Sequence, residues 1–125
     1  MSAEKSNANI KIYKGNSQEG FFPNDFSGDS SRVKMTDTNQ TTYLAIRYNQ
    51  SLTPGTHTFN YTQFNVEYLD PAGSRYSHLT AGTLVVTVVG NTHSGKLTGV
   101  VADVPGSGTP DTVEISGTYL IAVDD

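Results

Sequence analysis

The chain of 125 residues contains no cysteine and no tryptophan. The missing cysteine excludes a disulfide framework, a thiol nucleophile and any zinc site that uses cysteine. The missing tryptophan means that the chain lacks the side chain most expected on a sugar-stacking face. Neither absence argues against a folded domain, because a chain of this length buries roughly two thirds of its unfolded surface without a metal or a disulfide.

Charge is also scarce, since only 16% of the residues are charged. The net charge is −4, and the eight lysines and arginines are scattered along the sequence without a basic stripe. A nucleic-acid-binding protein normally shows such a stripe, and an anionic membrane surface attracts clustered cations. The sequence therefore argues against nucleic-acid binding and against binding to an anionic membrane.

Long apolar runs are missing as well. The longest, residues 84–89, is interrupted by Thr87 and is far too short to span a bilayer as a helix. The polar start, Met-Ser-Ala-Glu-Lys-Ser-Asn, has no apolar segment typical of a signal peptide. We therefore expect no membrane span and, by default, a cytoplasmic location. The alternatives are leaderless secretion or a leader that precedes the given sequence.

The last third of the chain consists almost entirely of β-forming residues. Residues 82–90, 96–104 and 112–123 are rich in valine, leucine, isoleucine and threonine, and polar turn residues fill the breaks at 91–95 and 105–111. Glycine, proline, asparagine and aspartate are typical of turns. The pattern predicts a three-strand meander at the end of the domain.

Earlier segments alternate between apolar and polar residues with a period of two. In residues 63–68, Phe64, Val66 and Tyr68 share one face, which is typical of a half-buried antiparallel strand. No segment shows a sustained period of 3.6 residues. The sequence therefore predicts an all-β fold, an antiparallel two-sheet β-sandwich of about seven to nine strands. The expected strands before the meander cover residues 9–13, 32–36, 41–49, 57–61, 63–68 and 75–78.

The chain shows no linker that would divide it into domains. Residues 1–8 are polar, and we expect them to be a flexible tail, with residues 9–125 forming a single β-sandwich domain. Residues 15–31 are rich in glycine, asparagine, aspartate and proline. This composition predicts a long, turn-rich loop.

Four short motifs follow one another in the second half of the chain. They are Pro-Gly-Thr-x-Thr-Phe at 54–59, Ala-Gly-Thr-Leu-x-Val-Thr at 81–87, Ser-Gly-Lys-Leu-x-Gly at 94–99 and Val-x-Ile-Ser-Gly-Thr-Tyr at 113–119. With these motifs, residues 54–123 resemble small bacterial β-sandwich domains of unknown function, which are often lipoproteins. The resemblance implies a β-sandwich and brings no catalytic residues.

The residue types used in catalysis form no recognisable arrangement. His57, His78 and His93 are far apart and have no partner at metal-ligand spacing. No nucleophile motif such as Gly-x-Ser-x-Gly occurs. We therefore predict that the protein is not an enzyme. The alternative is a hydrolase with an unrecognised site, because a triad is defined by its geometry.

Carboxylates gather in the loop predicted at 15–31, where Asp25 and Asp29 stand near Asn24 and Ser30. Hard oxygen ligands of this kind can hold calcium at the rim of a sandwich. Aspartate and asparagine in loops mostly serve turns, and this is the interpretation that we favour. The sequence thus predicts no metal or cofactor, and Asp25 and Asp29 are the candidate ligands if calcium binds.

Aromatic residues offer the best functional lead. Exposed aromatic side chains on a sandwich can stack on sugars or anchor a partner protein. Alternatively, the phenylalanines of the predicted loop fold back and cap the core. The candidate residues for a ligand or partner surface are Phe21, Phe22, Phe26, Tyr43, Tyr61 and Tyr76.

Our leading functional hypothesis is a non-enzymatic β-sandwich module that binds a partner through its loops or an edge strand. Sheet edges readily pair with other strands, so a homodimer by edge or face pairing belongs to this hypothesis. The alternative is a carbohydrate-binding, lectin-like module, with calcium assisting. The expected partner is accordingly a protein or a carbohydrate.

Overall fold

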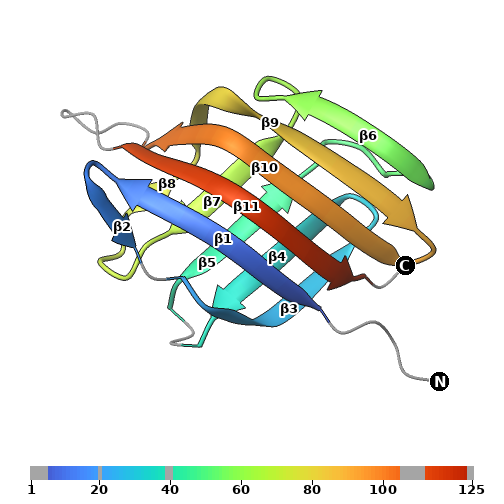
Figure 1. Cartoon of the computed structure of the whole chain (residues 1–125), viewed down its shortest axis with the longest axis horizontal. Coiled ribbons are helices and arrows are strands. Elements are labelled where there is room, and N and C mark those ends of the chain that lie inside the picture. Colours follow the sequence, from blue (N-terminus) through green and yellow to red (C-terminus); the bar gives the residue numbers. More distant parts are fainter. Residues whose placement is uncertain (1–5, 20, 39–40, 105–111, 124–125) are drawn as a thin grey trace.

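The computed structural model describes residues 6–19, 21–38, 41–104 and 112–123. Within these residues the chain forms only β-strands and turns, arranged in two antiparallel sheets (Figure 1). The first sheet has six strands, in the spatial order β2 (Ser17–Glu19), β1 (Asn7–Lys14), β11 (Thr112–Ala122), β10 (Thr92–Asp103), β9 (His78–Val89) and β6 (Gly55–Asn60).

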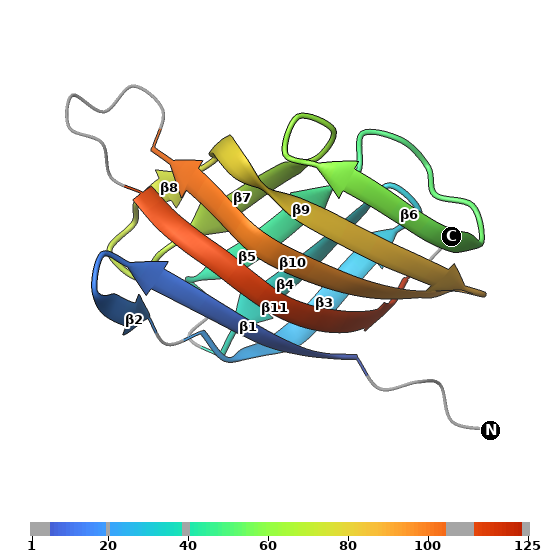
Figure 2. The same cartoon turned by 45° about the horizontal axis from the view of Figure 1, so that its top comes forward.

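The second sheet has five strands and lies against one face of the first. Its strands run across those of the six-stranded sheet, as Figures 1 and 2 show, which is an orthogonal form of sandwich packing. The predicted antiparallel two-sheet β-sandwich is therefore confirmed. The spatial order is β3 (Pro23–Asp29), β4 (Arg32–Asp37), β5 (Tyr43–Arg47), β7 (Asn65–Leu69) and β8 (Arg75–Tyr76).

The number of strands was predicted too low, since the described residues form eleven rather than seven to nine. The strands β2 and β3 fall inside the loop predicted at 15–31. Both are edge strands in which turn-forming or polar residues prevail, so neither carries an apolar alternation of its own. Their conformation comes from pairing with β1 and β4, which the local sequence does not reveal.

The predicted three-strand meander is confirmed, because β9, β10 and β11 are neighbours in chain order. The break predicted at 91–95 is shorter than expected. Only Gly90 and Asn91 form the turn, and β10 begins at Thr92. The second predicted break, 105–111, lies outside the described residues.

The N-terminal boundary also differs from the prediction. The strand β1 begins at Asn7, so two residues of the predicted tail are paired with β11. The main-chain amide of Ala122 also donates to the Ser6 hydroxyl at 3.0 Å. Residues 1–5 lie outside the described residues, as do residues 124–125.

The core lies between the two sheets and consists of the side chains that the alternation placed on one face. Strands β4, β5 and β7 each alternate between buried and more exposed residues. Fully burying a large apolar side chain contributes roughly 1.5–3 kcal/mol. The buried set includes Ile12, Met35, Leu44, Ile46, Phe64, Leu84, Leu97, Ile115 and Ile121.

A buried polar cluster joins the sheets at one end of the sandwich. Tyr48 follows β5, and its hydroxyl lies 3.1 Å from Nδ1 of His93 on β10 and 3.0 Å from the hydroxyl of Tyr119 on β11. All three side chains are almost completely buried. Burial is the main cause of the raised pKa values of the Tyr48 and Tyr119 hydroxyls, which therefore stay neutral in the core.

Replacing Tyr48 with phenylalanine is expected to lower the free energy of unfolding by about 1–2 kcal/mol, because two buried polar groups lose the shared hydroxyl. Urea denaturation measures this loss. Tyr61→Phe is the matched control, since the Tyr61 side chain is 41% exposed and its change should stay within about 0.5 kcal/mol. Equal stabilities of the two variants would contradict the assigned role of the cluster.

Candidate functional site

The outer face of the five-stranded sheet, turned away from the core, carries polar and charged side chains that alternate with the buried residues of its strands. The antiparallel register arranges its side chains in rows that cross the strands. One row consists of Asp29, Arg32, Arg47 and Asn65, and the next of Ser27, Lys34, Ala45 and Glu67. A third row consists of Asp25, Thr36, Tyr43, Leu69 and Arg75.

This face contains a hollow of about 450 Å³. Its short side chains are Ser27 on β3 and Ala45 on β5, which lie on either side of Lys34 in one row. Longer side chains on the neighbouring rows stand around them, including Arg32, Arg47 and Tyr43. We call this surface the sheet hollow, and its lining combines cations, carboxylates and one aromatic ring.

Positive charge is concentrated at the sheet hollow. Arg32, Lys34 and Arg47 line it, and Arg75 reaches its margin through an ion pair with Glu67 at 3.5 Å. These are four of the eight lysines and arginines in a chain whose net charge is −4. The sequence prediction of scattered cations was right along the chain, but the sheet register brings half of them together.

The cations of the sheet hollow differ in how far their charge is already paired. Arg32 lies 3.8 Å from Asp29, and Lys34 lies over the Tyr43 ring, 4.5 Å from its centre. Arg47 has no ion pair with any of the described residues. Exposed ion pairs contribute little to stability, so an incoming anion can compete for these groups at small cost.

Tyr43 is the one predicted aromatic residue that lines the sheet hollow. Its hydroxyl donates a hydrogen bond to Glu67, and this bond, with burial, raises the pKa of the hydroxyl. The bond and the contact with Lys34 hold the ring in place. Because Lys34 covers one face of the ring, Tyr43 contributes more to positioning charges than to free stacking surface.

The predicted aromatic surface was wrong for two of its members. Phe21 is buried edge-to-face against Tyr68, with ring centres 6.1 Å apart. Tyr76 is completely buried and stacks on Tyr68, with ring centres 5.9 Å apart. Both side chains belong to the core. For Phe21, this agrees with the alternative prediction that the phenylalanines of the predicted loop fold back and cap the core.

The other predicted aromatics do not form one surface. Phe26 packs partly buried against the core, and its strand pairs with β4. Phe22, which is 71% exposed, precedes β3, whereas Tyr61, 41% exposed, lies in the turn after β6. The six candidates are therefore distributed over the core and over separate parts of the surface.

The candidate calcium ligands do not converge. Asp25 and Asp29 are four residues apart on β3, which corresponds to about 13 Å along an extended strand. Oδ1 of Asp29 accepts hydrogen bonds from the backbone and hydroxyl of Ser31, both at 2.8 Å, and these bonds lower the pKa of the carboxyl. Asp29 thus serves the turn after β3.

The histidines also lie apart. His57 contacts the Thr53 carbonyl oxygen at 2.6 Å, His78 lies 3.5 Å from a carboxylate oxygen of Asp103, and His93 belongs to the buried cluster with Tyr48. Across residues 6–19, 21–38, 41–104 and 112–123, no three histidine, aspartate or glutamate side chains lie close enough together to hold a metal ion.

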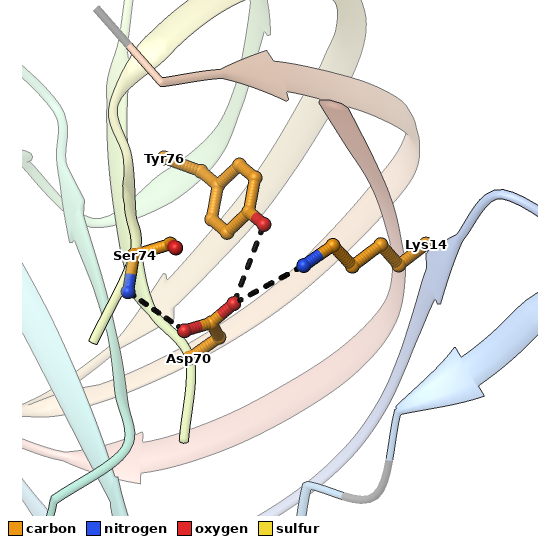
Figure 3. A network of polar contacts seen from close by, with 4 residues as sticks. All are labelled: Lys14, Asp70, Ser74 and Tyr76. Carbon is orange, nitrogen blue, oxygen red and sulfur yellow. Dashed lines mark hydrogen bonds and ion pairs between the residues drawn. The ribbon is translucent and has the colours of Figure 1, made fainter. Parts of the chain in front are cut away.

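A second polar network closes the end of the sandwich away from His93, and Figure 3 shows it. The carboxylate of Asp70, only 2% exposed, accepts the Ser74 amide at 2.8 Å and the Tyr76 hydroxyl at 3.3 Å. Nζ of Lys14, on the six-stranded sheet, lies 3.7 Å from the same carboxylate. The network therefore joins the two sheets. Because the Asp70 carboxylate is buried and already bonded to these three groups, we assign the network a role in holding the fold together and not in binding a ligand.

Comparison of the chain with models of protein families, with curated proteins and with solved structures found no match. The resemblance of residues 54–123 to small bacterial β-sandwich domains therefore stays a prediction. Within the described part of the chain there is no helix of the length and hydrophobicity needed to cross a membrane.

Proposed function

We propose that this protein is a non-enzymatic binding module that holds an acidic polypeptide segment of a partner in the sheet hollow. The observation that supports the proposal most is the gathering of Arg32, Lys34 and Arg47 around one concavity in a chain of net charge −4. The non-enzymatic part rests on the sequence, in which no nucleophile motif occurs.

The chemistry of the sheet hollow suits carboxylates. A guanidinium group binds a carboxylate through two parallel hydrogen bonds, and Arg47 has no competing ion pair among the described residues. Arg32 shares a row of the sheet with Arg47, and Lys34 lies in the next row. Asp29 and Glu67 fix the orientation of their neighbours and leave the face with an excess of cations.

Reversing the charge of Arg47 is expected to weaken binding of a labelled poly-glutamate peptide by about tenfold or more, equivalent to about 1.4 kcal/mol. Fluorescence anisotropy measures the affinity, and the wild-type affinity should fall as salt is added. Lys96→Glu is the matched control, because Lys96 is exposed on β10 of the other sheet. An equal loss in Lys96→Glu would show that net charge alone governs binding and would contradict the proposed site.

A carbohydrate is the second candidate ligand, and one observation favours it. The sheet hollow combines the Tyr43 ring with carboxylates at Asp29 and Glu67, which can accept hydrogen bonds from sugar hydroxyls. A glycan array, probed with calcium and with a chelator, separates the two ligands. Retention of a neutral glycan that is lost in Tyr43→Ala would replace the acidic polypeptide as the proposed ligand.

A further inference from the structure

The edge strands of the two sheets differ in how they are protected against pairing with other strands. Natural edge strands usually carry charged residues or proline. Glu19 ends β2, Asp25 and Asp29 lie on β3, and Arg75 lies on β8. The edge strand β6, with the sequence Gly-Thr-His-Thr-Phe-Asn, has no lysine, arginine, aspartate or glutamate.

The register shows which backbone groups of β6 face outward. Gly90 and Asn91 form a two-residue turn, so the flanking residues Val89 and Thr92 form a hydrogen-bonded pair, and the backbone groups of Val89 point toward β10. Successive residues of a strand point their backbone groups to opposite sides, so those of Val88, Val86 and Leu84 point toward β6. Through the pairing of β6 with β9, the amide and carbonyl groups of Thr56, Thr58 and Asn60 then point away from the sheet.

The third of these outward-facing residues is already capped. The main-chain amide of Asn60 donates a hydrogen bond to Oε1 of Gln63 at 3.0 Å. The main-chain carbonyl of Asn60 accepts one from the main-chain amide of Gln63 at 2.9 Å. These bonds agree with the orientation derived from the register. The open part of the edge is therefore the stretch between Thr56 and Thr58, with His57 at its centre.

A groove of about 590 Å³ runs beside this edge. One wall is β6 itself, and the other is the segment after β5, which includes Asn49 and Gln50. Its lining carries amides, hydroxyls and aromatic rings, and none of the lining residues is an aspartate, glutamate, lysine or arginine. A second strand can therefore approach the edge here without meeting a charged aspartate, glutamate, lysine or arginine side chain.

We infer that β6 pairs with β6 of a second copy of this chain, in an antiparallel arrangement around a two-fold axis at His57. Thr56 then lies opposite Thr58 of the other copy, and the outward amide and carbonyl groups of each satisfy those of the other. On the exposed face of the joined sheet, the side chains of Thr56 and Thr58 of opposite copies lie next to each other. Such cross-strand threonine pairs are favourable in antiparallel sheets.

The exposed apolar side chains around β6 fit this two-fold arrangement. Val89 is 70% exposed and lies on β9 beside the Gly55 end of β6, whereas Tyr61 follows the other end. Antiparallel pairing brings the end of one strand to the start of the other. Tyr61 of each copy therefore lies at the end of its partner's β6 where the partner's Val89 is exposed. An unrelated strand would not supply this apolar side chain, so the arrangement favours a second copy.

The full chain is expected to form a dimer whose population rises with concentration in sedimentation velocity. Thr58→Lys should weaken the dimer by about tenfold or more, because it places two positive charges close together. The two lysines are diagonal neighbours across the axis, and such residues lie about 7–8 Å apart. Thr98→Lys is the matched control, since Thr98 is exposed on the outer face of β10, away from this edge. Circular dichroism checks that both variants remain folded.

Hydrogen exchange followed by NMR gives a second readout that needs no variant. The amides of Thr56 and Thr58 should exchange quickly at low concentration and become protected as the dimer forms. A chain that stays monomeric at every concentration, or a dimer that Thr58→Lys leaves unchanged, would overturn the inference. Protection of these amides only when an extended peptide is added would also overturn it and identify the edge as a peptide-docking strand.

Discussion

Gly117→Ala is expected to lower the free energy of unfolding by about 3–5 kcal/mol, since it combines backbone strain with a steric clash. Gly117 lies opposite Ile10 where β11 pairs with β1, and its φ of 136° is a conformation that other residues rarely adopt. A Cβ at this position would overlap the Asn9 carbonyl oxygen and lie 2.8 Å from the Ile10 Cα. The clash is with backbone, so no rotation of a side chain relieves it.

Urea denaturation of Gly117→Ala and Gly55→Ala separates the two contributions. The φ of Gly55, 121°, is close to that of Gly117, but a Cβ there would meet nothing within 4 Å. The control should therefore lose only the strain, about 1–3 kcal/mol. If both variants lost the same stability, close packing of β1 on β11 would not be the reason for glycine at position 117.

The two-residue alternation predicted the strands of the core because burial of one sheet face imposes it. In β7, Val66 and Tyr68 are buried and the residues between them are not, as the sequence pattern indicated. The edge strand β3 has no such signal, because its pairing with β4 supplies the order that its residues do not encode locally. Edge strands of this kind are recognised only once their neighbours are placed.

The candidate site was less accessible to sequence reasoning than the fold. The spacing of Arg32 and Lys34 puts them on one face of a strand, and this signal was available. That Arg47 lies opposite Arg32 depends on the register between β4 and β5, which the sequence leaves open. The burial of Tyr76 depends likewise on the packing of β8 at the end of the core, since this strand has only two residues.

The two polar networks show how the sheets are fixed relative to each other when their strands cross. Apolar side chains give close packing but few directional bonds between the layers. The Tyr48 cluster supplies directional bonds at one end, and the network of Asp70 supplies them at the other. The residues that line the sheet hollow, and the outward-facing Thr56 and Thr58 of β6, belong to neither network, so they can be changed without removing these contacts.

Asp70→Ala is expected to lower the free energy of unfolding by about 2–4 kcal/mol, because one buried carboxylate holds three partners. The Ser74 amide and the Tyr76 hydroxyl lose their acceptor, and Lys14 loses its ion pair. Lys14 is 41% exposed and can turn toward water, so the loss should be smaller than for a fully buried ion pair.

Asp70→Asn is the matched control in the same denaturation experiment. Asparagine keeps an oxygen for the Ser74 amide and preserves the turn from Asp70 to Ser74, but it removes the charge that attracts Lys14. We expect it to lose about half as much stability as alanine, since partly exposed ion pairs contribute about 1 kcal/mol or less. Losses of equal size in the two variants would mean that the ion pair with Lys14, and not the turn, holds this end of the sandwich together.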